Sequence, residues 1–168
     1  MPQLIKGRAL AADRWALLRE SGAALPDGRA IVALAAWVAQ RDALAARGDV
    51  GVWLAPADDP GALAGDIARL PLVAVDFPQF VDGRGYSTAR LLRQRYGYTG
   101  ELRAIGDIQR DQLSYLAQCG FDAFALRDGE DANGALAAFH DFADGYQITE
   151  ARTPWFRRRV AMSRAVVE

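Results

Sequence analysis

The sequence predicts an α/β protein built around a mainly parallel sheet, and three observations carry this prediction. Short apolar runs alternate with amphipathic runs along the chain, in the order strand, loop, helix, strand. Turns rich in glycine and aspartate separate these runs. The 168 residues are 51% hydrophobic and 24% charged, a composition typical of a folded chain with a sizeable core. We therefore expect a single domain over residues 1–168.

The first third of the chain predicts a hairpin, a strand and a helix. Gln3–Ile5 and Ala9–Leu10 fit a small hairpin, although a helical turn explains the second run equally well. Ala30–Leu34 fits a buried strand, and Trp37–Arg47 fits a helix that the following glycine ends. A single continuous helix over residues 31–47 is the alternative.

Val50–Leu54 reads as a clear strand, and the loop after it predicts the start of a helix. Asp58 or Asp59 is suited to cap that helix, with Pro60 near its first position. The apolar side chains that this helix should turn inward are Leu63, Ile67 and Leu70.

The run from Pro71 to Leu126 organises the fold, because it repeats strand, turn and helix. The expected strands are Leu72–Val75, Leu102–Ile105 and Ala123–Leu126. The expected helices cover residues 86–96, 109–119 and 133–142. Since a helix follows each strand, these strands should be parallel to one another and to Val50–Leu54.

About five βα units fit the chain, which is too few for a closed eight-stranded barrel. The sequence therefore predicts a sheet of roughly five strands that resembles part of a TIM-type barrel, with a small doubly wound sheet as the alternative. A half-barrel would leave sheet edges exposed, so a homo-oligomeric scaffold is one functional hypothesis.

Charged residues follow several of the predicted parallel strands, at the point where each strand ends. Loops at the carboxyl ends of parallel strands gather on one edge of a sheet, where α/β proteins place their binding sites. We call this predicted surface the rim. Its candidate ligand-binding residues are Asp76, Asp82, Gly83, Arg84, Gly106, Asp107, Arg110 and Arg127, with Asp128 beside them.

Two short motifs on the rim have both a functional and a structural interpretation. Asp82-Gly83-Arg84 precedes a helix, so its backbone amides and guanidinium suit a bound phosphate or carboxylate, but a glycine turn with an internal ion pair explains it equally simply. Asp107 is a natural N-cap, which is a commoner role than catalysis. Arg110 follows in the first helical turn, where an anion contact or a surface ion pair would occupy it.

Several classes of function are disfavoured by the residues present. Cys119 is the single cysteine and fits a small core residue at a helix end, while the single histidine, His140, has no partner at metal-ligand or triad spacing. The net charge of −1 argues against general nucleic-acid binding. No signal segment or long apolar span occurs, so we expect a cytoplasmic protein. No flavin, nicotinamide, iron–sulfur or metal signature is found, and we expect no cofactor.

The segment 150–168 reads as a basic aromatic tail on a mildly acidic body, because it holds five arginines against two glutamates. A docking element for an acidic partner and a tail folded back on the sheet both explain it. The candidate partner-binding residues are Trp155, Phe156, Arg157, Arg158 and Arg159.

The chain resembles an uncharacterised bacterial family, domain of unknown function 934. The resemblance rests on GVWLAP, on the long run DFPQFVDGRGYSTARLLRQRYGYTGELRAIGDIQRDQL, on CGFDAF and on the terminal FRRR. The family pattern falls on Asp76, Pro78, Asp82, Gly83, Arg84, Arg90, Arg93, Gly106, Asp107, Asp111, Gln112, Cys119 and Gly120. It implies no established catalytic residues. It does imply a proteobacterial protein often encoded beside assimilatory sulfite reductase and sometimes labelled an oxidoreductase.

Two functional hypotheses follow. The first, which rests on the resemblance, is an accessory protein of sulfite reduction that binds the reductase or its electron donor. The second is a small-molecule enzyme or sensor that binds a sulfur oxyanion at the rim, with Arg84 and Arg110 sharing the ligand.

Overall fold

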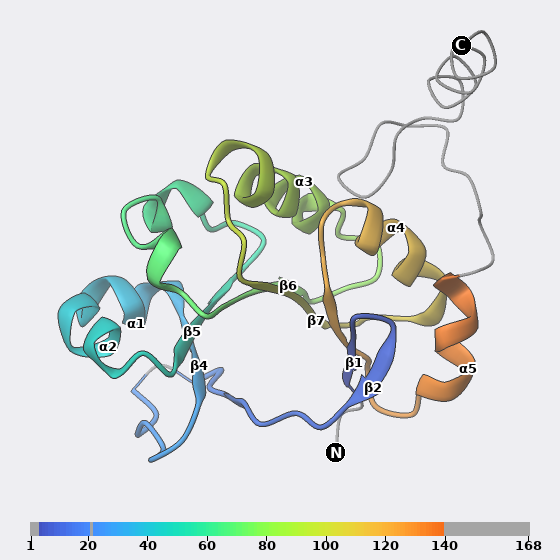
Figure 1. The fold of residues 1–168 in the computed structure, drawn as a ribbon, viewed down its shortest axis with the longest axis horizontal. Helices are drawn as coiled ribbons and strands as arrows, with labels where there is room; N and C mark the ends of the chain where they lie inside the picture. The colour runs from blue at the N-terminus through green and yellow to red at the C-terminus, as the bar shows by residue number, and fades with distance from the viewer. Residues whose placement is uncertain (1–3, 21, 140–168) are drawn as a thin grey trace, which may run out of the picture.

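The computed structural model describes residues 4–20 and 22–139, and Figure 1 shows their arrangement. The described chain forms an eight-stranded sheet in the order β2-β1-β8-β7-β6-β5-β4-β3. The sheet is curled and mostly parallel, so the protein has an α/β half-barrel fold. The expected α/β class is confirmed. The expected count of about five strands is not, because three further strands of two or three residues join the described sheet.

The amino-terminal strands are short and lie at both edges of the sheet. β1 (Leu4–Lys6) and β2 (Ala9–Ala11) form the expected hairpin. β1 also pairs with β8, antiparallel to it. At the opposite edge, β3 (Ala16–Leu17) pairs in parallel with β4 (Ala30–Ala33). The chain between β2 and β3 therefore crosses from one edge of the half-barrel to the other, as Figure 1 shows.

The four strands expected to be parallel are parallel. They are β5 (Val50–Leu54), β6 (Leu72–Phe77), β7 (Glu101–Gly106) and β8 (Ala123–Ala125). Their spatial order follows the chain order without the reversal that defines a doubly wound sheet. The half-barrel is thus the correct one of the two expected architectures.

The helices that connect these strands are short. α1 (Leu34–Ala39) and α2 (Arg41–Arg47) follow β4, and Gly48 ends α2 in the expected left-handed conformation at φ 72°. After β5, the expected helix is two 3₁₀ segments, η1 (Pro60–Leu63) and η2 (Ile67–Arg69). Asp59 caps η1 through the backbone nitrogen of Gly61, and Pro60 stands at the first position, as the sequence predicts.

The remaining helices follow β6, β7 and β8. α3 (Arg84–Arg90) continues into a π-helical turn, η3 (Leu91–Arg95). η4 (Arg110–Gln112) leads into α4 (Leu113–Gln118), and α5 (Ala132–Leu136) leads into η5 (Ala137–Phe139). In Figure 1, α3 and α4 lie over the same side of the sheet, with α1 and α2 at one end of it and α5 at the other.

The two faces of the sheet are covered differently. On the helix-covered, convex face, residues such as Val73 and Phe77 pack with the helices in the larger core. On the other, concave face, a smaller core holds Ile31, Leu72, Ala74 and Ile105, with Trp15 and Trp53 packed against it. Alternation along β6 places Asp76 on this second face. The extended chain around Trp15, rather than a helix, therefore covers the concave face.

Candidate functional site

Asp107 links three loops at the rim. One carboxylate oxygen accepts a hydrogen bond from the backbone nitrogen of Phe80, at 3.2 Å, in the loop after β6. The other oxygen lies 3.3 Å from the side-chain nitrogen of Gln109 and 3.4 Å from the guanidinium of Arg127, in the loop after β8. The rim loops after three neighbouring strands are therefore joined by one side chain.

The expected N-cap role of Asp107 is wrong. The helical turn after β7 begins at Arg110, and its N-cap is Gln109, which exchanges hydrogen bonds with Gln112 in a capping box. Because Asp107 lies three positions before the first helical residue, Arg110, its carboxylate binds neighbouring loops instead.

Gly106 allows the strands β6 and β7 to close together at the rim. Its φ is 102°, and a Cβ atom there would lie 2.3 Å from the carbonyl oxygen of Phe77 and 2.9 Å from a carboxylate oxygen of Asp76. The backbone nitrogen of Asp107 donates to the same Phe77 oxygen at 2.7 Å. A side chain at position 106 would therefore push these two strand ends apart.

Asp82 and Arg84 form an ion pair within their own loop. The Nε and Nη2 atoms of Arg84 lie 2.9 and 2.7 Å from the two oxygens of Asp82. This contact with Arg84 is the main cause that lowers the pKa of Asp82. Burial acts in the opposite direction, but the backbone amide of Arg84 also lowers the pKa, so the net pKa is below its ordinary value. Gly83 stands between them as the residue before α3. The geometry favours the internal ion pair over a preformed anion site.

The loop before Asp82 exposes two apolar side chains. Phe80 is 43% exposed and Val81 is 82% exposed. The loop is nevertheless held by hydrogen bonds, because Phe80 donates to Asp107 and the backbone nitrogen of Asp82 donates to Gln79 at 3.0 Å. We call Phe80 and Val81 the docking loop.

Asp76 does not join the other rim charges. It was expected in the loop after β6, but it lies inside the strand, 6% exposed, on the concave face. Its two oxygens accept hydrogen bonds from Arg19 at 2.8 and 3.0 Å, and the Arg19 guanidinium carbon lies 5.7 Å from the centre of the Trp53 ring. Arg19 was missed by sequence reasoning, since nothing in its neighbourhood predicts a partner 57 residues away.

The predicted rim residues thus divide into separate groups. Asp107, Gly106 and Arg127 lie together, while Asp82 and Arg84 pair with each other. Arg127 also pairs with Glu130 at 3.0 Å. Arg110 is exposed at the start of η4. Arg84 lies within 3.5 Å of the Asp82 carboxylate, and Arg127 lies within 3.5 Å of the Asp107 carboxylate. These rim charges therefore largely neutralise one another.

Two cavities lie away from the predicted rim residues. The larger, of about 460 Å³, lies between the chain after β3 and the helices α1 and α2, and its lining includes Leu18, Leu25, Val32, Ala36 and Leu44. The smaller, of about 340 Å³, is lined by Lys6, Trp15, Arg29, Asp49 and Glu101, among others. Neither lining contains a predicted rim residue.

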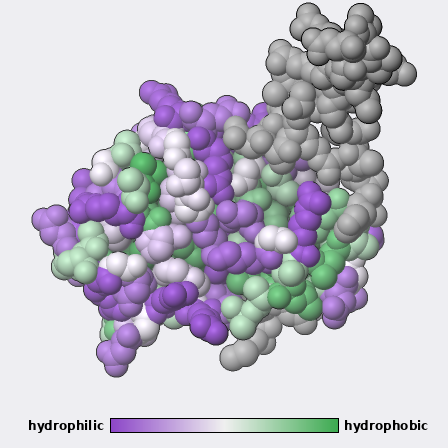
Figure 2. Space-filling view, in the orientation of Figure 1, coloured by the Kyte–Doolittle hydropathy of each residue, from purple (hydrophilic) through white to green (hydrophobic). Residues whose placement is uncertain are grey.

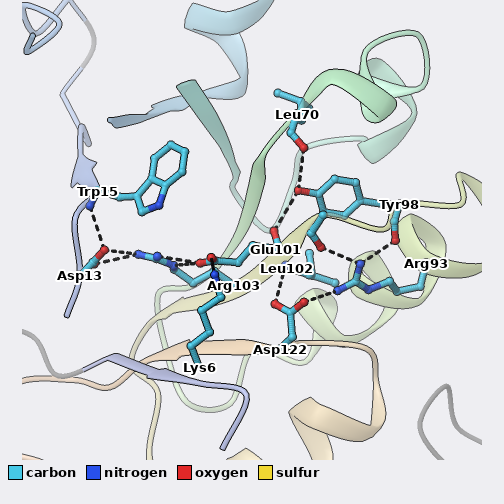
Figure 3. Close-up of polar contacts among 11 residues, drawn as sticks. Lys6, Asp13, Trp15, Leu70, Arg93, Tyr98, Glu101, Leu102, Arg103 and Asp122 are labelled. Carbon is cyan, nitrogen blue, oxygen red and sulfur yellow. Dashed lines mark hydrogen bonds and ion pairs between the residues drawn. The ribbon is translucent and has the colours of Figure 1, made fainter. Parts of the chain in front are cut away.

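A buried charge network crosses the concave face, and Figure 3 shows it beside Trp15. Arg103 is only 2% exposed and binds both oxygens of Asp13, at 2.8 and 2.9 Å, and Glu101 at 2.7 Å. Glu101 also binds Lys6 at 2.6 Å. The network attaches the chain before β3 to the sheet. An arginine inside the apolar run Leu102–Ile105 was the sequence signal for it.

A second network, also drawn in Figure 3, holds the amino ends of β7 and β8. Arg93 donates to the carbonyl oxygens of Tyr98, Gly100 and Gly120 and lies 3.1 Å from Asp122. The side chain of Arg93 is only 14% exposed. This network is structural, because it satisfies backbone carbonyls at strand starts.

Cys119 lies at the end of α4 and is fully buried, as expected for a core residue. Burial is the main cause that raises the pKa of its thiol. Gly120 follows at φ 109°, in agreement with its expected place after a helix end. His140 and the tail residues Trp155 to Arg159 lie outside the described residues.

Within residues 4–20 and 22–139, no group of three histidine, cysteine, aspartate or glutamate side chains could hold a metal ion. The helices of the same ranges are all too short or too polar to cross a membrane.

Figure 2 shows hydrophilic side chains over much of the visible face, with an apolar patch at lower right, over α5 and the β1–β2 hairpin. Leu10 in β2 is 47% exposed. This apolar surface coincides with one edge of the sheet, where β2 is the last strand.

Comparison with known proteins places the chain in a family. A search of curated proteins finds no match to it. Residues 51–156, well over half of the chain, match the model of a family described as bacterial protein of unknown function (DUF934). The match begins in β5 and includes all of the predicted rim. The chain is therefore a member of this family, domain of unknown function 934, as its central run suggested.

Proposed function

We propose that this protein is an accessory protein of assimilatory sulfite reduction, acting in the cytoplasm by binding the reductase or its electron donor through the rim. The observation that carries the proposal is the docking loop: Phe80 and Val81 are exposed side by side on a loop that Asp107 holds in place. Apolar side chains on a rigid support are typical anchors of protein interfaces, because they bind with little loss of conformational freedom.

The electrostatics of the rim support a protein partner. An apolar anchor with charged side chains beside it has the apolar centre and polar edge of a typical protein interface. The pairs Asp82–Arg84 and Asp107–Arg127 surround the docking loop in this way. The identity of the partner rests on the sulfite-reductase context that the family resemblance implies.

The proposal is tested by measuring the binding of purified sulfite reductase, and separately of its electron donor, to the immobilised protein. We expect Val81→Asp to weaken binding at least about tenfold, because a carboxylate would be buried without a partner in the interface. Phe80→Ala should weaken it by a similar factor. Val38→Asp is the matched control, since Val38 is 49% exposed on α1 and should leave the affinity unchanged.

The tail is examined with a separate variant. If Trp155 to Arg159 provide a second contact with an acidic partner, replacing Arg157, Arg158 and Arg159 by serine should weaken binding and reduce its dependence on salt. An affinity for both proteins that is immeasurable, or that Val81→Asp leaves unchanged, would contradict the proposal.

The alternative function, binding of a sulfur oxyanion at the rim, makes a different prediction. It requires Arg84 to exchange Asp82 for the anion, which costs the existing bidentate contact. Calorimetric titration with sulfite and sulfate distinguishes the two functions. Saturable binding that Arg84→Ala abolishes would favour the small-molecule function, whereas equal and negligible heats would favour the accessory protein.

A further inference from the structure

Asp76 is a buried carboxylate that depends on a side chain from an exposed segment. Both of its oxygens receive hydrogen bonds from the two terminal nitrogens of Arg19, at 2.8 and 3.0 Å. The carboxylate is 7% exposed, whereas the Arg19 side chain is 47% exposed. A carboxylate removed from water costs free energy unless charged donors compensate, so the site around Asp76 requires a cation.

Trp53 provides the second wall of this site. The guanidinium carbon of Arg19 lies 5.7 Å from the centre of the Trp53 ring. The indole is fixed in turn, because its Nε1 donates to the carbonyl oxygen of Leu18 at 3.0 Å. A carboxylate that accepts two parallel hydrogen bonds, beside an aromatic face, is the chemistry that recognises a planar guanidinium group.

The segment that carries Arg19 is largely exposed. It follows β3, a strand of two residues, and Arg19, Glu20 and Ala23 are exposed. The same segment lines the cavity of about 460 Å³ at α1 and α2. Because its side chain is 47% exposed, Arg19 can move into solvent without unfolding the core when another cation takes its place.

We propose that Trp53 and Asp76 form a recognition site for a guanidinium group, which Arg19 fills in the free protein and from which an arginine side chain of a partner protein displaces it. Arginine suits the site better than lysine, because both Asp76 oxygens face a planar bidentate donor.

The intramolecular position of Arg19 sets the strength of the competition. A tethered group acts at an effective concentration in the millimolar range or above, so an isolated guanidinium ion competes poorly with it. A partner's arginine would therefore need additional contacts. Once Arg19 is removed, however, a small guanidinium compound should enter the site directly.

The experiment titrates the Arg19→Ala variant with ethylguanidinium and follows the indole N–H resonance of Trp53 by NMR. We expect saturable binding with a dissociation constant in the millimolar range. The apparent constant for the wild type should be at least about tenfold higher, because Arg19 occupies the site. Ethylurea, which has the same shape without the charge, should bind neither protein.

Matched variants separate the site from general effects of the compound. Adding Asp76→Asn to Arg19→Ala should abolish the binding of ethylguanidinium. Arg84→Ala, which removes an arginine from an exposed ion pair, should behave as the wild type. Adding Val81→Asp to Arg19→Ala should leave the affinity unchanged, so this proposal and the docking loop fail or succeed independently.

Three results would overturn the proposal: no saturable binding to folded Arg19→Ala, equal affinity after Asp76→Asn, or equal affinity of the wild type and Arg19→Ala. If Arg19→Ala does not fold, Arg19→Gln replaces it. Glutamine keeps one amide donor near Asp76 but has no charge, so ethylguanidinium should still bind. Its failure to bind a folded Arg19→Gln would count equally against the proposal.

Discussion

The carboxylate of Asp107 lies 3.2 Å from the backbone nitrogen of Phe80, and this contact fixes the docking loop against the neighbouring strand. Because Phe80 is 43% exposed, its apolar ring alone would not hold the loop in one conformation. The loop after β6 is thus held in position by the side chain of Asp107, which directly follows β7.

Replacing Asp107 by alanine should release this loop. The free energy of unfolding should fall by about 1 kcal/mol, the usual net contribution of a hydrogen bond to a charged acceptor at a partly exposed site. The more specific result is faster hydrogen exchange at the Phe80 amide. Asp128→Ala is the control, since Asp128 is exposed in the loop after β8. Unchanged exchange at Phe80 would show that Asp107 does not hold the loop.

Gly106→Ala should destabilise the protein strongly. The new Cβ would meet the Phe77 carbonyl oxygen at 2.3 Å at a φ of 102°, so β6 and β7 must separate at the rim. We expect a loss of roughly 2–4 kcal/mol in the free energy of unfolding, measured by urea denaturation. Gly129→Ala has a similar φ of 89° with nothing within 4 Å, and should cost only about 1 kcal/mol. Equal costs would contradict the clash at Gly106.

The carboxylate of Asp66 should make the protein sensitive to acid. Asp66 is 2% exposed and binds Trp37 and Arg69. Burial, the largest influence, raises its pKa, but the hydrogen bonds from Trp37 and Arg69 and the charge of Arg41 bring the pKa below its ordinary value of 3.8. A lowered pKa means that Asp66 contributes stability above pH 3.8, and this is lost as the pH falls through the lower, folded value.

Asp122 should have the opposite effect. Partial burial raises its pKa above 3.8 in spite of the charge of Arg93, and because 46% of its side chain is exposed the effect on stability should be small. Its contribution to stability is therefore present below pH 3.8 and lost as the pH rises through the raised value. In urea denaturation from about pH 2 to about pH 7, Asp66→Asn should flatten the loss of stability in acid, and Asp122→Asn should flatten the loss on the alkaline side of pH 3.8. Slopes of the same sign would contradict these assignments.

Cys119 should react slowly with thiol reagents in the folded protein. Its side chain is fully buried and burial raises the pKa of the thiol, so both access and the thiolate fraction are low at neutral pH. Labelling should accelerate by orders of magnitude in denaturant, and Cys119→Ala should retain partner binding. Rapid labelling of the native protein would instead indicate that α4 opens.

The sequence predicted the parallel part of the sheet because its signals are local. Apolar runs of five or six residues such as Val50–Leu54 are long enough to identify a strand, and a helix between two such runs requires a parallel crossover. Two helix ends were also predicted correctly. Gly48 ends α2 and Asp59 caps η1, because each acts on backbone groups within two or three residues of itself.

The strand count and the charge pairs could not be predicted in this way. β3 has two residues, too few for any periodicity, and it is a strand only because β4 lies beside it. Arg103 reads as an interruption of an apolar run until Asp13, 90 residues away, is brought to it. Electrostatic pairing depends on distances in space, which the spacing of residues along the chain does not contain.

The sequence by itself therefore determined the α/β class, the parallel order of the central strands and the family, all of which depend on patterns within one segment. Only the tertiary structure decided what the rim residues do. It placed Asp76 inside β6 with Arg19, gave Asp107 the backbone of Phe80 as a partner, and paired Arg84 with Asp82. The physical reason is that a carboxylate binds the nearest available donor, and the curl of the sheet decides which donor is nearest.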